Sequence, residues 1–500
     1  MPLHLRESDD FEYLRDSLRA VGFNQESICS RLGIKGLHEL LSGTRTRVTL
    51  SQGCDEPGFL IRLFLFGESL SKEDMDSVFP SRLPEVLANL GLVSEDARDG
   101  NRMFSPVALY PVGSLFIVSD RWRELHDKDF ALSDDFVFPA ITPNTSQFLA
   151  NLPLTPCDSF LELCSGTGVA ALAASRFAHH AWAIDITERS AEMGEFNRLL
   201  NGLDNVTVRK SDLYDGVQDL SFERIVAQPP SVPVLRPSQV FCDGGVDGEQ
   251  VTRRMVEGLP RYLKPGGCFY CLAQGSDRKG AAFEQRIRGW LGESQGEFDV
   301  LVVVRQLQNP QDAAVQYGMT SSGGRFAAGQ MRDALLSLDV ESLVYGWIVI
   351  QRRKDGRKVF TVRRATAREE RREEIAWLLR WEAFAAGAPS LDAVQEMTPV
   401  ANRSLELHTV HRIKDGNLAP DGFKLHTEDP FTMDCLVPSW AGYLISHCDG
   451  KSTVRRLLET CKAGNLIPPD TPPEEFAKVI IFLFSGGFLE VTGFSLPKSR

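Results

Sequence analysis

The sequence predicts an α/β protein built on a doubly wound, seven-stranded sheet, with a winged-helix-like domain on either side of it. Two observations carry this prediction. From about residue 134 the chain alternates short β-type apolar runs with helical runs, which is typical of a parallel sheet with crossover helices. The first β-type run ends in a glycine turn, Glu162–Gly168 (ELCSGTG), that opens a helical run. A strand, a glycine turn and a helix in this order begin many doubly wound sheets.

The seven predicted strands follow one another along the chain, and each has the apolar, β-branched or aromatic character of a buried strand. They are expected within residues 159–164, 180–187, 205–215, 222–230, 260–274, 297–307 and 342–353. Helical patterns lie between them, which gives the crossovers that parallel neighbours require.

Composition excludes several classes of protein. The chain has 500 residues, of which 43% are hydrophobic and 24% charged, as in ordinary globular proteins. Its net charge of -12 disfavours nucleic acid as a partner, although a local basic cleft would be hidden in that sum. No apolar run is long enough to cross a membrane, and the charged start of the chain is unlike a signal peptide. We expect a cytoplasmic protein, and the cysteine and histidine spacings predict no metal site.

The pattern divides the chain into three predicted domains. Residues 1–130 read as helices followed by a strand pair, a winged-helix-like domain whose simplest role is packing. Residues 131–365 hold the sheet, including a glycine-rich stretch at 319–330 that is expected to form a mobile flap. Residues 366–500 read as a helical linker and a second winged-helix-like domain, with a homodimer as one role left open.

The glycine turn and the next strand predict a site for a nucleoside. Gly166 and Gly168 allow backbone torsions and a close approach that a Cβ would block. Asp185 ends the second predicted strand, at the separation expected of a carboxylate that holds two ribose hydroxyls. A dinucleotide would favour a third glycine where Ala171 stands, and the acidic Glu162 suits a cation better than a pyrophosphate.

With these motifs the chain resembles the class I methyltransferases that use S-adenosyl-L-methionine (SAM), in particular the small-domain group that methylates ribosomal RNA bases and release-factor glutamine. The resemblance covers about residues 134–362 and includes Asp212 in KSDLYD and the loop GGVDGEQ before a helix. It implies a Rossmann-like fold, SAM as cofactor and a methyltransferase activity. The cofactor-binding residues that it implies are Glu162, Cys164, Ser165, Gly166, Gly168, Asp185, Ile186, Asp212, Leu213 and Gln228.

The resemblance also implies that Gln228 and Pro229 are catalytic. N-methylating members of the group end the fourth strand with Asn or Asp, two prolines and Tyr or Phe, whose amide and carbonyl accept from the target nitrogen. Here the tetrapeptide is Gln228-Pro229-Pro230-Ser231, which keeps an amide but lacks an aromatic face for stacking. We therefore expect a compact acceptor: a nitrogen, sulfur or oxygen of a small molecule or peptide. The alternative acceptors are a ribosomal RNA base and a protein glutamine. A further alternative is that Gln228 has no catalytic role and only ends the strand.

Two other classes of function stay open. A nicotinamide oxidoreductase would share the fold but needs the third glycine and a phosphate site. A SAM-sensing, winged-helix regulator would bind the cofactor without transferring the methyl group. The last seventy or so residues resemble the small PqqD-like domains that deliver peptides to modifying enzymes, and a dimerisation or lid role is the alternative for them.

Overall fold

The computed structural model describes residues 3–5, 9–42, 55–79, 82–96, 99–121, 133–235, 239–320, 324–367, 369 and 371–491. The chain divides into two compact units, which are treated one at a time. The first comprises residues 1–276 and 310–341, and the second comprises residues 277–309 and 342–500.

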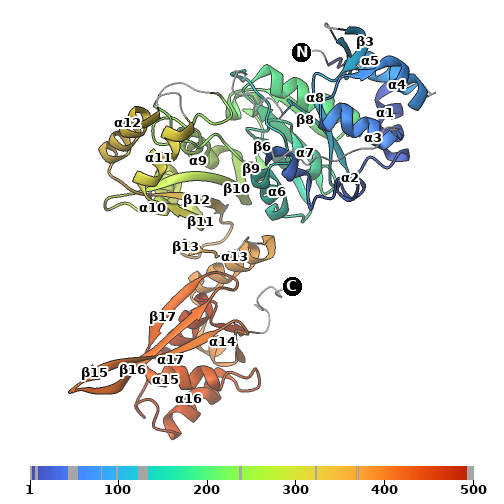
Figure 1. Ribbon diagram of the computed structural model, residues 1–500. Helices are drawn as coiled ribbons and strands as arrows, with labels where there is room; N and C mark the ends of the chain where they lie inside the picture. The colour runs from blue at the N-terminus through green and yellow to red at the C-terminus, as the bar shows by residue number, and fades with distance from the viewer. Residues whose placement is uncertain are drawn as a thin grey trace. The chain divides into compact units, whose positions relative to one another are not determined.

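The first unit contains a parallel sheet with the strand order β10-β9-β6-β7-β8 (Figure 1). Its strands are β6 (Cys157–Leu163), β7 (Ala178–Asp185), β8 (Val206–Lys210), β9 (Phe222–Ala227) and β10 (Leu263–Arg278). The helices among them are α6 (Pro143–Asn151), α7 (Val169–Ala174), α8 (Glu188–Asn201) and α9 (Gln250–Tyr262). The order reverses between β6 and β9, so the prediction of a doubly wound α/β sheet is confirmed.

The central strands explain why this sheet forms. In β6 and β9 both faces are buried, and Phe160, Leu161, Ile225 and Val226 are fully inaccessible to solvent. Parallel strands covered on both faces read as continuous apolar runs, which is how these two strands read in the sequence. Helix α8 begins at the N-cap Thr187, whose side chain accepts from the Ser190 amide, and it ends at a left-handed glycine.

The N-terminal part of the same unit is a series of short helices followed by small antiparallel sheets. Its helices are α1 (Asp9–Ala20), α2 (Gln25–Leu32), α3 (Glu56–Leu60), α4 (Lys72–Val78) and α5 (Leu83–Asn89). Its strands are β1 (Leu70–Ser71), β2 (Ser94–Asp96), β3 (Asp99–Phe104), β4 (Ala108–Val112) and β5 (Leu115–Ser119). Strands β2 and β3 pair directly after α4 and α5, the order that a winged helix requires. The winged-helix assignment and the three-domain division stay predictions.

Two asparagines of α8 hold the hairpin strand β5 as if they were a neighbouring strand. Asn197 accepts from the Val118 amide at 2.7 Å and donates to the Val118 carbonyl at 3.1 Å. One helical turn later, Asn201 accepts from the Phe116 amide at 2.9 Å and donates to its carbonyl at 2.7 Å. Each side-chain amide thus satisfies both backbone groups of one residue, and β5 is fixed against the helix that follows β7.

An ion pair fixes the chain beyond β5. The carboxylate of Asp120 is nearly buried, accepts from the Arg189 Nε at 2.9 Å and from the Val137 amide at 2.8 Å. Arg189 lies in the first turn of α8, so this pair and the two asparagines act along the same helix. The N-terminal part is therefore bonded to the parallel sheet through α8.

The second unit contains three further strands of the predicted region: β11 (Phe298–Gln308), β12 (Val340–Arg352) and β13 (Thr361–Ala365). Strand β11 pairs antiparallel with β12 and parallel with β13. The described residues from β6 to β13 therefore carry eight strands, one more than predicted, because β13 was missed. The stretch 319–330 was predicted to be a flap, but α11 (Pro310–Thr320) and α12 (Gly324–Ser337) occupy its described residues.

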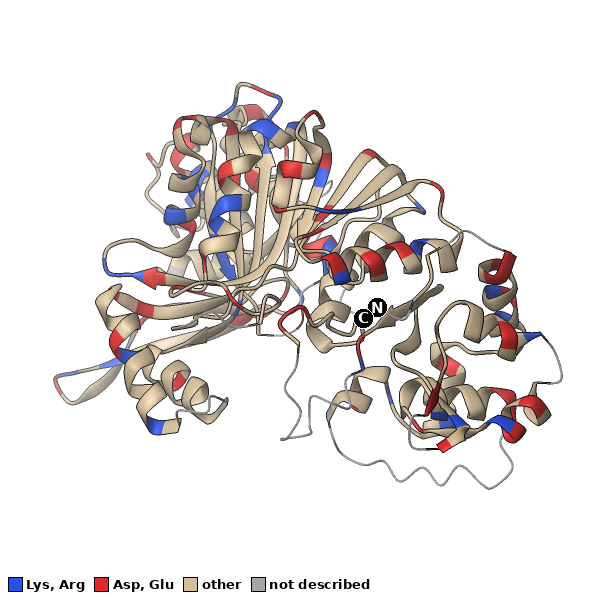
Figure 2. Cartoon of the chain, turned by 90° about the horizontal axis from the view of Figure 1, so that it is seen from above, with Lys and Arg blue, Asp and Glu red and all other residues tan. Residues whose placement is uncertain are grey.

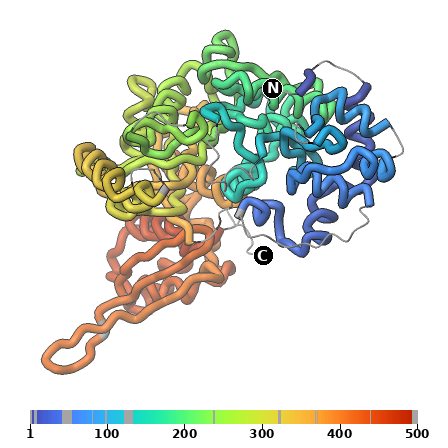
Figure 3. Tube along the Cα trace, turned by 45° about the horizontal axis from the view of Figure 1, so that its top comes forward, coloured from blue at the N-terminus to red at the C-terminus, as the bar shows by residue number. Residues whose placement is uncertain are grey.

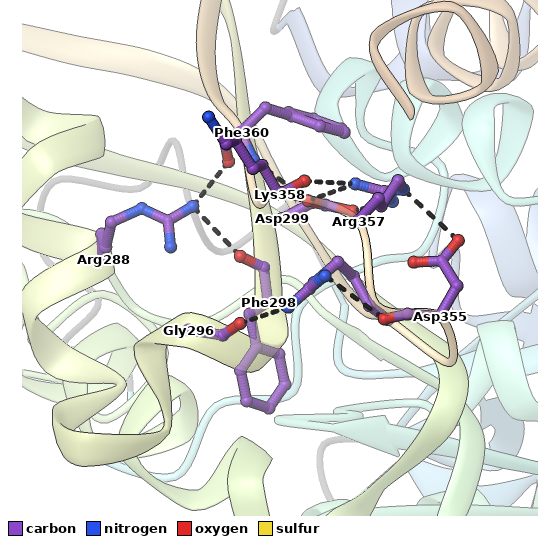
Figure 4. Close-up of polar contacts among 9 residues, drawn as sticks. Arg288, Gly296, Phe298, Asp299, Asp355, Arg357, Lys358 and Phe360 are labelled. Carbon is purple, nitrogen blue, oxygen red and sulfur yellow. Dashed lines mark hydrogen bonds and ion pairs between the residues drawn. The ribbon is translucent and has the colours of Figure 1, made fainter. Parts of the chain in front are cut away.

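Partly buried arginines hold this unit together (Figure 4). Arg288 in α10 (Phe283–Trp290) donates to the carbonyls of Gln295, Phe298 and Phe360 at 2.5 to 3.1 Å, which ties the helix to the starts of two strands. Arg357 pairs with the fully buried Asp299, which also accepts from the Phe360 amide at 3.1 Å. Burial lowers the pKa of Arg288, and the nearby charge of Arg353 adds to this shift, although Asp299 opposes it.

The C-terminal part of the second unit, for which a helical linker and a winged-helix-like domain were predicted, also contains strands that the sequence analysis did not predict. It contains a three-stranded antiparallel sheet of β15 (Glu406–Lys414), β16 (Asn417–Thr427) and β17 (Met433–Val437). Figure 3 shows the β15–β16 hairpin as a long arm. The remaining elements are α13 (Arg372–Ala386), α14 (Leu391–Gln395), β14 (Pro399–Ala401), α15 (Ser439–Ser446), α16 (Val454–Ala463), α17 (Pro473–Ser485) and β18 (Leu489–Val491).

Charges of both signs are interspersed along the helices (Figure 2). Many of the described arginines are paired, including three in the basic stretch 352–372. The acids opposite Arg352, Arg363 and Arg364 are Glu297, Asp277 and Glu382. Within the described residues, none of the helices combines the length and the apolar character that a membrane crossing requires.

Replacing Asn197 with Ala should destabilise the first unit strongly. The substitution leaves a buried backbone amide and two buried carbonyls without their partner, and each unsatisfied group costs about 1–3 kcal/mol. Asn201→Ala is the matched control, because Asn201 bonds one residue of the same strand but is only partly buried. Urea denaturation should show a clearly larger loss of unfolding free energy for Asn197→Ala than for Asn201→Ala. Equal losses would contradict the role given to the buried Asn197 amide.

Candidate functional site

The carboxyl ends of three parallel strands meet at the point where the strand order reverses. Leu163, the last residue of β6, pairs with Ile184 of β7 on one side and with Ala227 of β9 on the other. The residues that follow these three, Cys164, Asp185 and Gln228, therefore leave the sheet side by side. Ligands of doubly wound sheets bind at such a switch point.

The glycine turn after β6 is tight and closely packed on one side. The Gly168 amide donates to the Ser165 carbonyl at 2.8 Å, and the Ser165 amide donates to the Ile184 carbonyl at 3.0 Å. Gly166 and Gly168 have φ of +52° and +75°, which residues with a Cβ rarely adopt. A Cβ on Gly168 would lie 3.7 Å from the Cα of Gly194 in α8, whereas one on Gly166 would meet no atom within 4 Å.

Glu162 lies beneath this turn and is 4% exposed. Its carboxylate accepts from the amides of Ala170 and Ala171 at 3.3 and 2.7 Å, and these are among the first amides of α7. Burial raises the pKa of Glu162 to about 8, although the two amides oppose that shift. Glu162 therefore orients the helix that follows the turn and contributes a carboxyl group whose charge a cation nearby would stabilise.

Asp185 is held by the segments on either side of it. Its Oδ2 accepts from the Gly166 amide at 2.8 Å and its Oδ1 accepts from the Thr187 amide at 3.1 Å. The Thr187 hydroxyl also lies 3.4 Å from Oδ1, whereas Oδ2 keeps a lone pair that can accept from a hydroxyl of a ligand. Ile186, the next residue, is 49% exposed and offers an apolar surface beside this carboxylate.

The end of β8 brings a third carboxylate to the same edge. Asp212 forms an ion pair with Arg254 of α9 at 2.9 Å, and both side chains are partly exposed. Leu213 follows with a φ of +48°, a conformation that turns the chain sharply into a short helix. The hydroxyl oxygen of Ser211 is buried and has no hydrogen-bond partner among the described residues. A buried polar atom of this kind is suited to a ligand.

Gln228 follows β9 and is contacted by the helix that precedes the sheet. The Thr145 hydroxyl in the first turn of α6 donates to the Gln228 Oε1 at 3.4 Å. Pro229 is buried and cannot donate, while Ser231 Oγ accepts from the Gln274 amide of β10 at 3.1 Å. The tetrapeptide is thus fixed at both ends, with Gln228 partly exposed between them.

The loop after the tetrapeptide folds back on itself. The Val232 amide donates to the Cys242 carbonyl at 3.0 Å, and the Gly244 amide donates to the Val232 carbonyl at 3.1 Å. A Cβ on Gly248 would lie 2.7 Å from the Ser231 carbonyl oxygen, so only glycine fits there. Glu249, fully buried, accepts from the Ser276 amide and hydroxyl, each at 2.7 Å, and closes this loop onto β10.

An apolar rim borders this loop. Phe138, Val232, Val240 and Val246 are 38 to 50% exposed. The rings of Phe138 and Phe241 lie 5.0 Å apart, which joins the segment before α6 to the loop after β9. Arg236 is the single Lys or Arg in the stretches 133–145 and 228–249, and it lies outside the described residues.

The residues at the ends of these strands fit a cationic ligand that lacks phosphate. Glu162, Asp185 and Asp212 bring three carboxyl groups to the ends of neighbouring strands, and the described cation in contact with them is Arg254, paired with Asp212. The Asp185 carboxylate would repel a pyrophosphate, whereas a ligand with a positive charge and a ribose is complementary to it and would also favour the ionised form of Glu162. Among the described residues, no group of His, Cys, Asp and Glu is arranged to hold a metal ion.

Sequence reasoning identified the strand-end residues but missed their partners. Thr145 and the Phe138 and Phe241 pair come from segments without a recognised motif, whereas Glu249 lies in the recognised GGVDGEQ loop but was not singled out. The N-cap pattern of Thr142-Pro143 before a helix could have located α6, yet nothing in the pattern indicates which strand end its first turn would meet.

Comparison with known proteins gives a family for part of the chain. Residues 134–295 match the family model of the methyltransferase small domain. A ribosomal protein uL3 glutamine methyltransferase from Bradyrhizobium diazoefficiens is 33% identical over 161 residues, 29% of this chain and 50% of that protein. A release factor glutamine methyltransferase from Moorella thermoacetica is 30% identical over 141 residues, 25% of this chain and 49% of that protein.

The chain spans about half the length of these curated relatives. Among solved structures, a ribosomal protein L11 methylase from Lactobacillus delbrueckii subsp. bulgaricus is 18% identical, with 42% of this chain and 79% of that one covered, at a TM-score of 0.25. The fold assignment rests on the strand order and registers described above.

The pH dependence of the free energy of unfolding should reveal the raised pKa of Glu162. Its pKa of about 8 in the folded protein lies above the ordinary value of 4.5, so folding binds a proton. The stabilisation is complete below pH 4.5 and is lost as the pH rises through 8, with a slope of at most about 1.4 kcal/mol per pH unit. Glu162→Gln cannot ionise, so its stability relative to the parent should increase over this range.

Denaturation of both proteins between about pH 5 and pH 9 measures this difference. Glu188→Gln, at the exposed start of α8, controls for the change in net charge. A constant difference between Glu162→Gln and the parent would show that Glu162 is already ionised in the folded protein.

Proposed function

The chain contains a methyltransferase small domain of the class I, SAM-dependent type, and on that premise we propose that it transfers the SAM methyl group to a nitrogen of a peptidyl acceptor. The observation that carries the proposal is the shared edge at the ends of β6, β7 and β9. It brings Asp185, the glycine turn and Gln228 together at the switch point of the sheet.

The cofactor half of the proposal assigns roles to the strand-end residues. Asp185 would hold the ribose hydroxyls, with Ile186 packing beside them. Asp212 and Leu213 would frame the adenine, where the Ser211 hydroxyl is buried without a partner among the described residues. The turn from Cys164 to Gly168 would surround the methionine part, and the Glu162 carboxyl group beneath the turn would favour its positive charges.

The acceptor half assigns the transfer to Gln228 and Pro229. SAM supplies a methyl group on a sulfonium, so the acceptor nitrogen gains the methyl, the sulfur keeps the electron pair of the broken C–S bond, and one proton leaves the nitrogen for water. Gln228 and the Pro229 carbonyl hold the acceptor so that its lone pair points at the methyl group. Positioning of this kind provides a large part of the rate enhancement in transfers between two bound molecules.

The surroundings of Gln228 favour a peptidyl acceptor over a nucleic acid. The apolar rim of Phe138, Val232, Val240 and Val246 suits aliphatic side chains next to the methylated group. A nucleic acid needs cations against its phosphates, and the rim stretches carry several acids and a single arginine. The relatives are named for glutamine methylation, so a glutamine side-chain amide is the acceptor that we propose first.

One observation favours a second acceptor class. Ser231 supplies no ring to stack on a planar amide, and its hydroxyl is engaged by the Gln274 amide. An amine of a compact peptide or small molecule has no plane that needs such a wall, and it is the second candidate.

Replacing Asp185 with Ala should weaken SAM binding by an order of magnitude or more. The change removes the charge-assisted bonds to the ribose, worth about 1.5–3 kcal/mol each, and also frees the amides of Gly166 and Thr187. Asp185→Asn, which keeps one acceptor oxygen, should lose less. Calorimetric titration with SAM measures the effect, and an unchanged dissociation constant would remove Asp185 from the cofactor site.

A direct test of the function uses SAM labelled in the methyl group. The full-length protein is incubated with purified release factor, purified ribosomal protein uL3, total RNA and a small-molecule extract in separate reactions. We expect label in a protein fraction, on a glutamine side chain after hydrolysis to amino acids. Gln228→Ala should bind SAM with nearly the parental affinity but transfer about a hundredfold less label.

The other possible results of the labelling experiment lead to different conclusions about the acceptor. Label in RNA would contradict the acceptor class, and label on a protein amine would select the second candidate. Tight SAM binding without label in any reaction would support a SAM-binding regulator.

A further inference from the structure

A relay of two hydroxyl groups ends on Gln228. Thr142 is the N-cap of α6, and its Oγ1 accepts from the Thr145 amide at 3.1 Å. The same hydroxyl donates to the Thr145 Oγ1 at 2.9 Å. The Thr145 hydroxyl in turn donates to the Gln228 Oε1 at 3.4 Å. Its proton is thus directed to Gln228, because its own oxygen already accepts from Thr142.

This relay compensates for a property of glutamine. Compared with asparagine, glutamine has one more rotatable bond, and ordering a longer side chain costs additional conformational entropy. Gln228 is only partly buried, so packing alone does not fix its amide. A donor on the rigid first turn of α6 selects one orientation of the group, because a carbonyl oxygen can accept from a hydroxyl and the NH2 end is itself a donor.

The two ends of the Gln228 amide therefore differ. Its oxygen is engaged by Thr145. Its NH2 group forms no hydrogen bond with any other described residue. A group next to that NH2 end must accept a hydrogen bond, whereas the neighbouring Pro229 can offer only a carbonyl, which accepts one.

We propose that Thr145 is a positioning residue that holds the oxygen of Gln228, and that the NH2 end of Gln228 consequently binds the carbonyl oxygen of the acceptor. The proposal rests on the function proposed above and narrows its acceptor to a carboxamide. A carboxamide presents a carbonyl oxygen for the Gln228 NH2 group and an N–H for the Pro229 carbonyl. An amine or a thiol has no carbonyl, so it would leave the Gln228 donor without a partner.

The Gln228→Glu variant tests the donor role of the NH2 group. Gln228→Glu has nearly the same shape, still accepts from Thr145, and replaces the NH2 donor with an acceptor oxygen. With purified release factor or uL3 as acceptor, we expect Gln228→Glu to be as slow as Gln228→Ala in single-turnover methyl transfer. A Gln228→Glu protein with nearly the parental rate would overturn the donor role of the NH2 group. SAM dissociation constants of both variants show whether the cofactor site is intact.

Thr145 is tested by removing its hydroxyl and by keeping it. Thr145→Val has the same shape without the donor, and we expect about a tenfold lower transfer rate with unchanged SAM affinity and melting temperature. Thr145→Ser keeps the hydroxyl and should recover most of that rate. Ser146→Ala removes the exposed hydroxyl of the next residue in α6 and is the matched control. In a Gln228→Ala background, Thr145→Val should have no further effect, because the two residues act through one contact.

A spectroscopic measurement keeps this test independent of the acceptor. In protein labelled with 15N-glutamine, the side-chain NH2 signals of Gln228 are those that disappear in Gln228→Ala. They should shift in Thr145→Val and stay in place in Ser146→Ala. If labelled SAM modifies no protein but these signals shift, the proposed function fails while the contact stands. Signals that do not move in Thr145→Val, or a Thr145→Ser variant as slow as Thr145→Val, would overturn the proposal.

Discussion

The buried amide of Asn197 joins three parts of the first unit that are distant in the sequence. It accepts from and donates to Val118 of β5, and it donates to the Thr167 carbonyl in the glycine turn at 3.1 Å. All of its hydrogen-bonding groups are thus used in a fully buried position, where an unmade bond is costly. Helix α8 must lie against the turn for this contact, and on its other side Gly194 allows a close approach to Val208 of β8, where an added Cβ would lie 3.0 Å from the valine side chain. Asn197 therefore links the N-terminal part, through β5, to the glycine turn of the proposed cofactor site.

The cofactor side could be predicted from sequence because its residues are encoded locally. A glycine turn, the carboxylate that ends the next strand and the proline pair each lie within a few residues of a strand end, and parallel strands bring their ends to one edge. The acceptor side depends on segments that meet only in the folded chain. Thr145 contacts a residue that is 83 positions away, and the Phe138 and Phe241 rings come from two separate loops. No periodicity or spacing in the sequence indicates which of these distant segments will be in contact.

The strands that the sequence analysis missed carry charged residues or have mostly exposed side chains. Strand β13 contains Arg363 and Arg364, whose charges are compensated by Asp277 and Glu382, so it does not read as apolar. In β15 most side chains are exposed, which removes the alternation that marks a half-buried strand. One local indication was present: Asp415 and Gly416 both have positive φ at the tip of the hairpin, and Asp-Gly favours that turn.

The way in which α8 holds β5 also bears on the behaviour of the protein at high concentration. A strand with unpaired amides and carbonyls along one side can recruit a strand from another molecule, which is a common route to aggregation. In β5 the backbone groups of Phe116 and Val118 bond to the amides of Asn201 and Asn197. Two side chains of a helix thus cover a strand edge as a neighbouring strand would, and one of them, Asn197, also holds the glycine turn through the Thr167 carbonyl.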